Sequence, residues 1–156
     1  MIIFGVDPGT AITGWAVISG DHQKQKLLDC GSIITSKLKD QGARLEEIYD
    51  GILKKLHEFK PVVLAIEKLF FNTNQKTALV VGQTHGVVRL AAAKAGIKTV
   101  EYTPLEVKMA ITGYGRAEKK QIQYMIGKLL KLKEPIIKDD VADAVAIALC
   151  HCYNNH

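Results

Sequence analysis

Acidic residues in this sequence stand where apolar segments begin or end. Asp7 ends the first apolar run of the chain, and Glu67 ends a second one at residues 62–66. Asp140 and Asp143 open a stretch rich in Ala and Val. A carboxylate is costly to remove from water unless a cation or a hydrogen-bond donor compensates its charge. Because carboxylate oxygens are ligands that Mg²⁺ and Mn²⁺ prefer, these four side chains predict a divalent-cation site if the fold gathers them.

The spacing of the last two acidic residues favours such a shared site. Asp140 and Asp143 are three positions apart, so on a helix they lie on one face and repel each other unless a cation lies between them. Other roles remain open at this stage. Asp140 could be an N-cap, and Asp143 an exposed acid of the first helical turn. Asp7 could be a turn residue before Pro8, and Glu67 could belong to a salt bridge.

Length and charge narrow the class of protein. We expect residues 1–156 to form a single domain, long enough for a substantial core. The composition is that of a globular chain, with 47% hydrophobic and 24% charged residues. The net charge of +5 and the pI of about 9.1 suit a polyanionic partner such as nucleic acid.

Cysteine usage and hydropathy indicate the compartment. The three cysteines, Cys30, Cys150 and Cys152, have no disulfide-framework spacing, so we expect a reducing cytoplasm. Cys150-His151-Cys152 lacks a second ligand pair at zinc spacing and is interpreted as part of a helix end. No signal-peptide pattern is visible, and no apolar run approaches the ~20 residues of a membrane span.

Hydrophobic periodicity and turn residues predict alternating strands and helices. The expected strands are 2–7, 13–19, 27–35, 62–67 and 97–102, and the expected helices are 41–59, 75–95, 104–111, 117–131 and 139–153. The first three strands read as an antiparallel meander, and the later ones alternate with helices. This pattern predicts an α/β domain with a mixed sheet and helices on both faces.

Four blocks of sequence carry a resemblance to a known family. They are residues 5–17, which start Gly-Val-Asp-Pro-Gly-Thr; residues 65–71, Ala-Ile-Glu-Lys-Leu-Phe-Phe; residues 101–119, which hold Glu-Tyr-Thr-Pro, Val-Lys, Gly-Tyr-Gly and Ala-Glu-Lys; and residues 140–148, followed by His151. Their order and spacing resemble those of RuvC-type Holliday junction resolvases over nearly the whole chain.

The resemblance implies an RNase H-like fold and a homodimeric, Mg²⁺-dependent endonuclease. Such enzymes nick two opposed strands of a four-way DNA junction symmetrically during recombination and repair, alongside a branch-migration motor. The catalytic carboxylates would be Asp7, Glu67, Asp140 and Asp143. Some relatives carry a histidine at the position of Asp140, and Asp139 beside it departs from the pattern.

The four carboxylates also suggest how two bound cations would be distributed among them. We hypothesise two Mg²⁺ ions per subunit, replaceable by Mn²⁺, with Asp7 as the bridging ligand. In this hypothesis Glu67 and Asp143 bind separate ions, and Asp140 completes one coordination shell.

The resemblance and the charge pattern together suggest DNA contacts. Phe70 matches an aromatic residue near the junction crossover, and Lys108 and Lys119 match basic positions near the cleaved strand. Arg116 and Lys120 flank Lys119 beside a glycine-rich loop. Further candidates for phosphate contacts are Lys68, Arg89 and Lys94. Each of these charges alone could equally be an ordinary solvated surface residue.

The long helix expected at 75–95 could serve a dimer. Gly82 and Gly86 are four residues apart and would allow another backbone to approach closely. The same face could instead pack on the chain's own sheet.

Two other function classes compete with the nuclease. Nucleotide-binding modules of the actin and sugar-kinase type also begin with a strand and an Asp-x-Gly-Thr turn, here Asp7 to Thr10. They need two domains, in a chain about twice this length. The third reading is an inactive junction-binding scaffold, and the presence of all four carboxylates argues against it.

Overall fold

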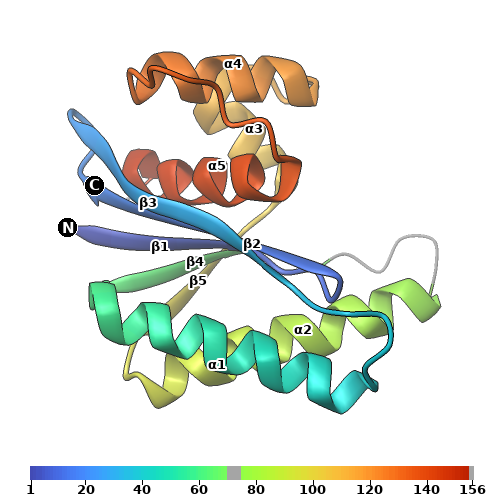
Figure 1. Ribbon diagram of the computed structural model, residues 1–156. Helices are drawn as coiled ribbons and strands as arrows, with labels where there is room; N and C mark the ends of the chain where they lie inside the picture. The colour runs from blue at the N-terminus through green and yellow to red at the C-terminus, as the bar shows by residue number, and fades with distance from the viewer. Residues whose placement is uncertain (70–74, 155–156) are drawn as a thin grey trace.

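A five-stranded mixed sheet forms the centre of the protein in the computed structural model, which describes residues 1–69 and 75–154 (Figure 1). The strands are β1 (Ile2–Asp7), β2 (Ile12–Gly20), β3 (Gln25–Ile34), β4 (Val63–Glu67) and β5 (Lys98–Tyr102). Their order is β3-β2-β1-β4-β5; β1 to β3 form an antiparallel meander, and β4 and β5 continue parallel to β1. The expected mixed sheet is therefore confirmed.

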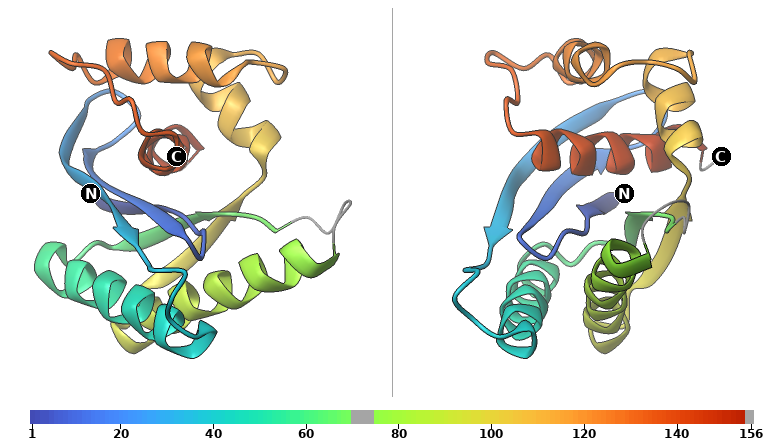
Figure 2. Two further views of the ribbon diagram at one scale, coloured as in Figure 1. Left: turned by 45° about the vertical axis from the view of Figure 1, so that its right-hand side comes forward. Right: turned by 90° about the vertical axis from the view of Figure 1, so that its right-hand side faces the viewer.

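Helices cover both faces of this sheet (Figure 2). The helices are α1 (Gln41–Phe59), α2 (Gln75–Lys94), α3 (Pro104–Thr112), α4 (Lys119–Leu129) and α5 (Asp139–Asn154). α1 and α2 lie on one face, whereas α5 lies on the other and is covered in turn by α3 and α4. Within the described residues, no helix combines the length and the apolar composition that crossing a bilayer requires.

Side-chain alternation explains why the sheet carries two cores. Successive residues of a strand point to opposite faces, so Phe4 and Val6 pack toward α1 and α2 while Ile3 packs toward α5. On α1, the buried residues Ile48 and Ile52 recur at helical spacing and complete the first of these cores.

Two elements differ from the sequence expectation by two residues at one or both ends. The helix expected at 117–131 begins at Lys119, because the Gln121 side chain accepts a hydrogen bond of 2.8 Å from the Glu118 backbone N–H and makes Glu118 the N-cap. The same helix ends at Leu129, and Lys131 has a positive φ of 51°. The strand expected at 27–35 begins at Gln25, where the hairpin with β2 extends the pairing.

Two glycines let α5 lie directly against the sheet. A Cβ on Gly5 of β1 would be 2.2 Å from the carbonyl oxygen of Ala144. A Cβ on Gly14 of β2 would be 1.9 Å from the carbonyl oxygen of Asp140. Because neither position tolerates a side chain, the backbone of α5 touches the backbones of β1 and β2.

Gly5→Ala should therefore destabilise the fold by about 1–3 kcal/mol or more, because the methyl group must push α5 away from β1. The change in the free energy of unfolding can be measured with urea. Gly127→Ala in α4 is the matched control, since its added Cβ meets no atom within 4 Å. That control should gain about 0.5–1 kcal/mol from helix propensity. Equal stabilities of the two variants would contradict the close packing of α5.

Candidate active site

Two of the four acidic residues end neighbouring parallel strands. Asp7 is the last residue of β1 and Glu67 the last residue of β4, and the pairing of Val6 with Ile66 places them side by side. Since both follow the alternation that directs Ile3 and Gly5 toward α5, their side chains point to that helix.

Asp140 and Asp143 complete the group from the N-terminal part of α5. The burial of Asp7, together with the charges of Asp143, Glu67 and Asp140, raises the pKa of Asp7 from 3.8 to about 7. Burial and the charge of Asp143 likewise raise the pKa of Glu67. The four carboxylates predicted from the sequence thus share one electrostatic environment.

Lys119 supplies the opposing charge. Its Nζ lies 3.6 Å from Oδ2 of Asp143 and 3.5 Å from Oδ2 of Asp139. Burial raises the pKa of Asp143, and Lys119 acts against this rise. Asp139 also accepts a hydrogen bond of 2.9 Å from Nε2 of Gln123. Asp139 is therefore turned toward α4, which separates its role from that of Asp140 and Asp143.

Threonine hydroxyls hold the turn that follows Asp7. Thr10 and Thr84 are buried, and their hydroxyl oxygens are 2.7 Å apart, which joins this turn to α2. The hydroxyl of Thr35 donates to the carbonyl oxygen of Thr10 at 2.6 Å, and Nε of Arg44 donates to the Thr35 hydroxyl at 2.9 Å. Thr13 also donates to the carbonyl oxygen of Gly9 at 2.7 Å. The turn is thus tied to β3, α1 and α2 at once.

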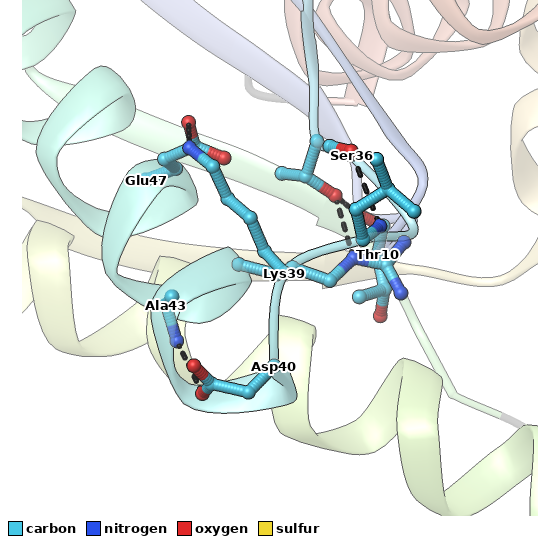
Figure 3. Close-up of polar contacts among 9 residues, drawn as sticks. Thr10, Ser36, Lys39, Asp40, Ala43 and Glu47 are labelled. Carbon is cyan, nitrogen blue, oxygen red and sulfur yellow. Dashed lines mark hydrogen bonds and ion pairs between the residues drawn. The ribbon is translucent and has the colours of Figure 1, made fainter.

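The segment before α1 is ordered by similar contacts (Figure 3). Asp40 caps α1 by accepting a hydrogen bond of 3.0 Å from the backbone N–H of Ala43. Lys39 forms an ion pair with Glu47 one turn further along the helix. Thr35, the residue before Ser36, donates to the carbonyl oxygen of Thr10, so the segment that leads into α1 is bonded to the turn after Asp7.

A buried histidine supports the second strand end. His85 of α2 hydrogen-bonds to the backbone of Glu67, and burial lowers the pKa of the imidazole. Its Nε2 lies 3.3 Å from Oε1 of Glu101, although the direction does not make a hydrogen bond. Nη1 of Arg89 lies 3.5 Å from the same oxygen, so Arg89 is ion-paired within the fold.

Comparison with known proteins assigns this arrangement to a family. The family model described as crossover junction endodeoxyribonuclease RuvC matches residues 3–151. The chain belongs to the RuvC family. RuvC of Alkaliphilus metalliredigens is 49% identical over 156 residues, which cover 100% of this chain and 95% of that relative. RuvC of Halothermothrix orenii is 48% identical over 151 residues, covering 97% and 92% of the two chains.

Solved RuvC structures have the same fold. Thermus thermophilus RuvC superposes with a TM-score of 0.90 at 35% identity, covering 98% of this chain and 94% of the other. The T. thermophilus RuvC structure in complex with its Holliday junction substrate gives a TM-score of 0.93 at 35% identity, with coverage of 98% and 93%. The RNase H-like architecture expected from the resemblance is confirmed, and the family match decides against the actin-like nucleotide-binding module.

The donor set fits the divalent metal on which RuvC nucleases depend. All four candidate ligands are carboxylates, which suit hard cations and not zinc. The mutual repulsion that raises the pKa of Asp7 is relieved when a cation neutralises the group. Within residues 1–69 and 75–154, no three His, Cys, Asp or Glu side chains are close enough to enclose one ion as they stand.

The other Cys/His group lies at the end of α5. His151 is in the last turn of this helix, and its Nδ1 is 2.7 Å from the hydroxyl of Tyr102. Cys150 and Cys152 are buried free thiols in the same helix. The expectation that this segment forms a helix end is confirmed.

The five residues predicted to contact DNA differ in where they lie relative to the carboxylates. Lys108 faces the site, since its charge lowers the pKa of Glu67, as that of Lys119 does. Arg116 and Lys120 are exposed beside Lys119. Phe70 lies outside the described residues. Contact with DNA stays a prediction for all five.

Sequence reasoning missed Thr84 and His85, which position the two strand ends. Both are polar residues on a helix face that continues through the buried Val88 and Ala91. Two adjacent polar residues in line with an apolar stripe, Val88 and Ala91 at i+4 and i+7 from Thr84, were the available signal. Their partners could not be read from the sequence, since Thr10 and Thr84 are 74 residues apart.

The raised pKa of Asp7 makes stability depend on pH. Between pH ~4 and ~7 the folded protein keeps a proton on Asp7 that the unfolded chain releases, so stability falls as pH rises, by up to about 1.4 kcal/mol per pH unit. Asp7→Asn removes this slope and should stabilise the metal-free protein at pH 7 by about 2–4 kcal/mol. Urea unfolding in EDTA across this range measures it. Asp50→Asn on the exposed side of α1 serves as the control and should keep the wild-type slope; an unchanged slope in Asp7→Asn would contradict the crowding of charges.

Thr84→Val should destabilise the protein by about 0.5–1.5 kcal/mol, because the buried hydroxyl of Thr10 loses the shorter of its two hydrogen bonds and keeps only the one to the carbonyl oxygen of Val80 at 3.4 Å. Thr84→Ser keeps the hydroxyl and should retain most of the stability. Thermal or urea unfolding of both variants separates the hydrogen bond from packing. Equal stabilities of the valine and serine variants would contradict a stabilising role for the hydrogen bond between Thr10 and Thr84.

Proposed function

We propose that this protein resolves four-way DNA junctions by metal-dependent hydrolysis of phosphodiester bonds, acting in recombination and repair. The observation that carries the proposal is the meeting of Asp7 and Glu67, from neighbouring parallel strands, with Asp143 of α5. Membership in the RuvC family and the superposition on a RuvC–Holliday junction complex support the choice of substrate.

The residues of the site have different roles in the proposed reaction. Asp7, Glu67, Asp140 and Asp143 would hold two Mg²⁺ ions per subunit, or Mn²⁺ in their place. When bound, these ions supply activation of water and neutralise charge on the leaving oxygen. Lys119 places a positive charge beside Asp143, where a scissile phosphate needs a counter-charge. From α2, Thr84 and His85 hold the turn after β1 and the end of β4 through hydrogen bonds.

Burial within the site favours this chemistry. Asp7, Glu67 and Asp143 are each only partly exposed, so the local dielectric strengthens their interaction with a cation. Lys108 faces Glu67 from α3, opposite Lys119 on α4. A DNA strand lying over the carboxylates would therefore meet lysines from two separate helices.

A homodimer would supply two such sites for two symmetric nicks. On α2, a Cβ added at Gly82 would meet only Leu69, at 3.9 Å, and one added at Gly86 would meet no atom within 4 Å, so among the described residues this face of the helix is open. Leu79 and Leu90 are 65% and 50% exposed and continue the same side of the helix. An exposed apolar stripe with small residues suits close packing against a second copy. This favours the dimer reading of α2 over packing on its own sheet.

Two further assignments complete the proposal. Resolution of a junction would follow its movement by a branch-migration motor, which we expect as a partner. The free thiols of Cys30, Cys150 and Cys152 suit the cytoplasm, where we place the reaction.

Asp143→Asn should reduce cleavage of a synthetic four-way junction in Mg²⁺ by at least about a hundredfold while junction binding persists. The reason is that a ligand of the cation site is lost without loss of fold. Paired nicks are measured on labelled strands, with EDTA and a linear duplex of the same sequence as substrate controls.

Asp139→Asn is the matched control, because Asp139 lies in the same turn but faces Gln123 and Lys119. It should keep most of the cleavage activity. Equal cleavage by the two variants would remove Asp143 from the site, and binding without any metal-dependent nicking by the wild type would favour the inactive scaffold.

A further inference from the structure

A pocket opens between α4 and the loop that follows α3, outside the group of carboxylates. Its volume is about 400 Å³. The lining residues are Thr112, Tyr114, Ala117, Lys120, Gln121, Tyr124 and Met125. Most of the wall is apolar, although the pocket is open to solvent. The carboxylate site and the core leave this pocket without a role.

Two exposed aromatic rings line the pocket. Tyr114 comes from the loop and is 56% exposed, and Tyr124 comes from α4 and is 64% exposed. Nζ of Lys128 lies 5.4 Å from the centre of the Tyr124 ring. Exposed aromatic rings beside lysines are typical of surfaces that stack unpaired nucleobases, because every base has a flat face.

The charge around the pocket favours a nucleic acid as its occupant. Lys120 lines the pocket, and no acidic residue does so among those described. Arg116 and Lys119 flank it in the sequence and are exposed. A group of positive charges attracts the negatively charged phosphates of a nucleic acid. It offers no comparable attraction to an apolar peptide.

The first turn of α4 contributes residues both to the group of carboxylates and to the pocket. Lys119 contacts Asp143 at 3.6 Å, and the next residue, Lys120, points into the pocket. Successive helical residues lie about 100° apart, so this turn separates the two sites by the width of one helix. A DNA strand that leaves the carboxylates on this side meets the pocket next. A protein bound there would instead block the path of that strand.

We propose that this pocket binds one unstacked base of the DNA strand that leaves the active site. The base lies between Tyr114 and Tyr124, and Lys120 contacts an adjacent phosphate. The proposal rests on the proposed function, because it requires junction DNA to lie over the carboxylates. It assigns to the pocket a role in holding the strand, distinct from the chemistry of the carboxylates.

The test places the fluorescent base 2-aminopurine at successive positions on either side of the cleavage site in a four-way junction. Junctions are bound in EDTA, so that they stay intact. Stacking on tyrosine quenches the fluorescence, so wild-type protein should quench it at one position. Tyr114→Ala with Tyr124→Ala should abolish this quenching and weaken junction binding about tenfold. Tyr114→Phe with Tyr124→Phe should retain both, since the rings remain.

Leu38→Ala is the control, because Leu38 is 98% exposed and lies far along the chain, before α1. It should leave the quenching and the binding unchanged. Circular dichroism and urea unfolding of each variant establish that the fold is intact.

Two outcomes would overturn the proposal. One is quenching that persists in the double alanine variant, which would leave the pocket free for another occupant such as a protein. The other is the absence of a quenched position with the wild type. Failure of the proposed function is recognised separately, as loss of Mg²⁺-dependent nicking by the wild type.

Discussion

The site depends on direct contact between the backbone of α5 and the backbones of β1 and β2. Gly5 and Gly14 make this contact possible, because any side chain there would overlap with carbonyl oxygens of Ala144 and Asp140. The contact brings the N-terminal part of α5 to the end of β1, where Asp7 lies. The apolar cores on the two faces of the sheet then hold acidic groups together against their repulsion.

The fold limits that repulsion with few groups. Lys119 pairs with Asp143, and the first turn of α4 that carries it is fixed by the cap at Glu118. From the opposite face of the sheet, Thr84 bonds the hydroxyl of Thr10 and His85 bonds the backbone of Glu67, so neither contact uses a carboxylate of the site. The crowded carboxylates that would bind a cation therefore lower the stability of the fold at Asp7, and packing elsewhere in the structure compensates for this loss.

Much of this arrangement could be predicted from the sequence, because strand alternation and helix periodicity are local. Asp7 and Glu67 end apolar strands, and the ends of neighbouring parallel strands meet at one edge of a sheet. The orientation of Asp139 was not predictable, since it depends on Gln123 and Lys119 in another helix. The Thr10–Thr84 pair likewise arises only from tertiary packing, and so does the start of α4 at Lys119.

The pKa of about 7 at Asp7 has a consequence for the use of cations. Near neutral pH the carboxyl group is protonated about as often as it is ionised, and the proton must leave before the oxygens can act as ligands. A cation that binds therefore displaces this proton, and the two compete for the carboxylate of Asp7. The apparent affinity for a divalent ion should rise up to about tenfold for each pH unit gained below pH 7 and level off above it. A pH close to 7 would place this protein at the bend of that dependence, where a small acidification already weakens cation binding.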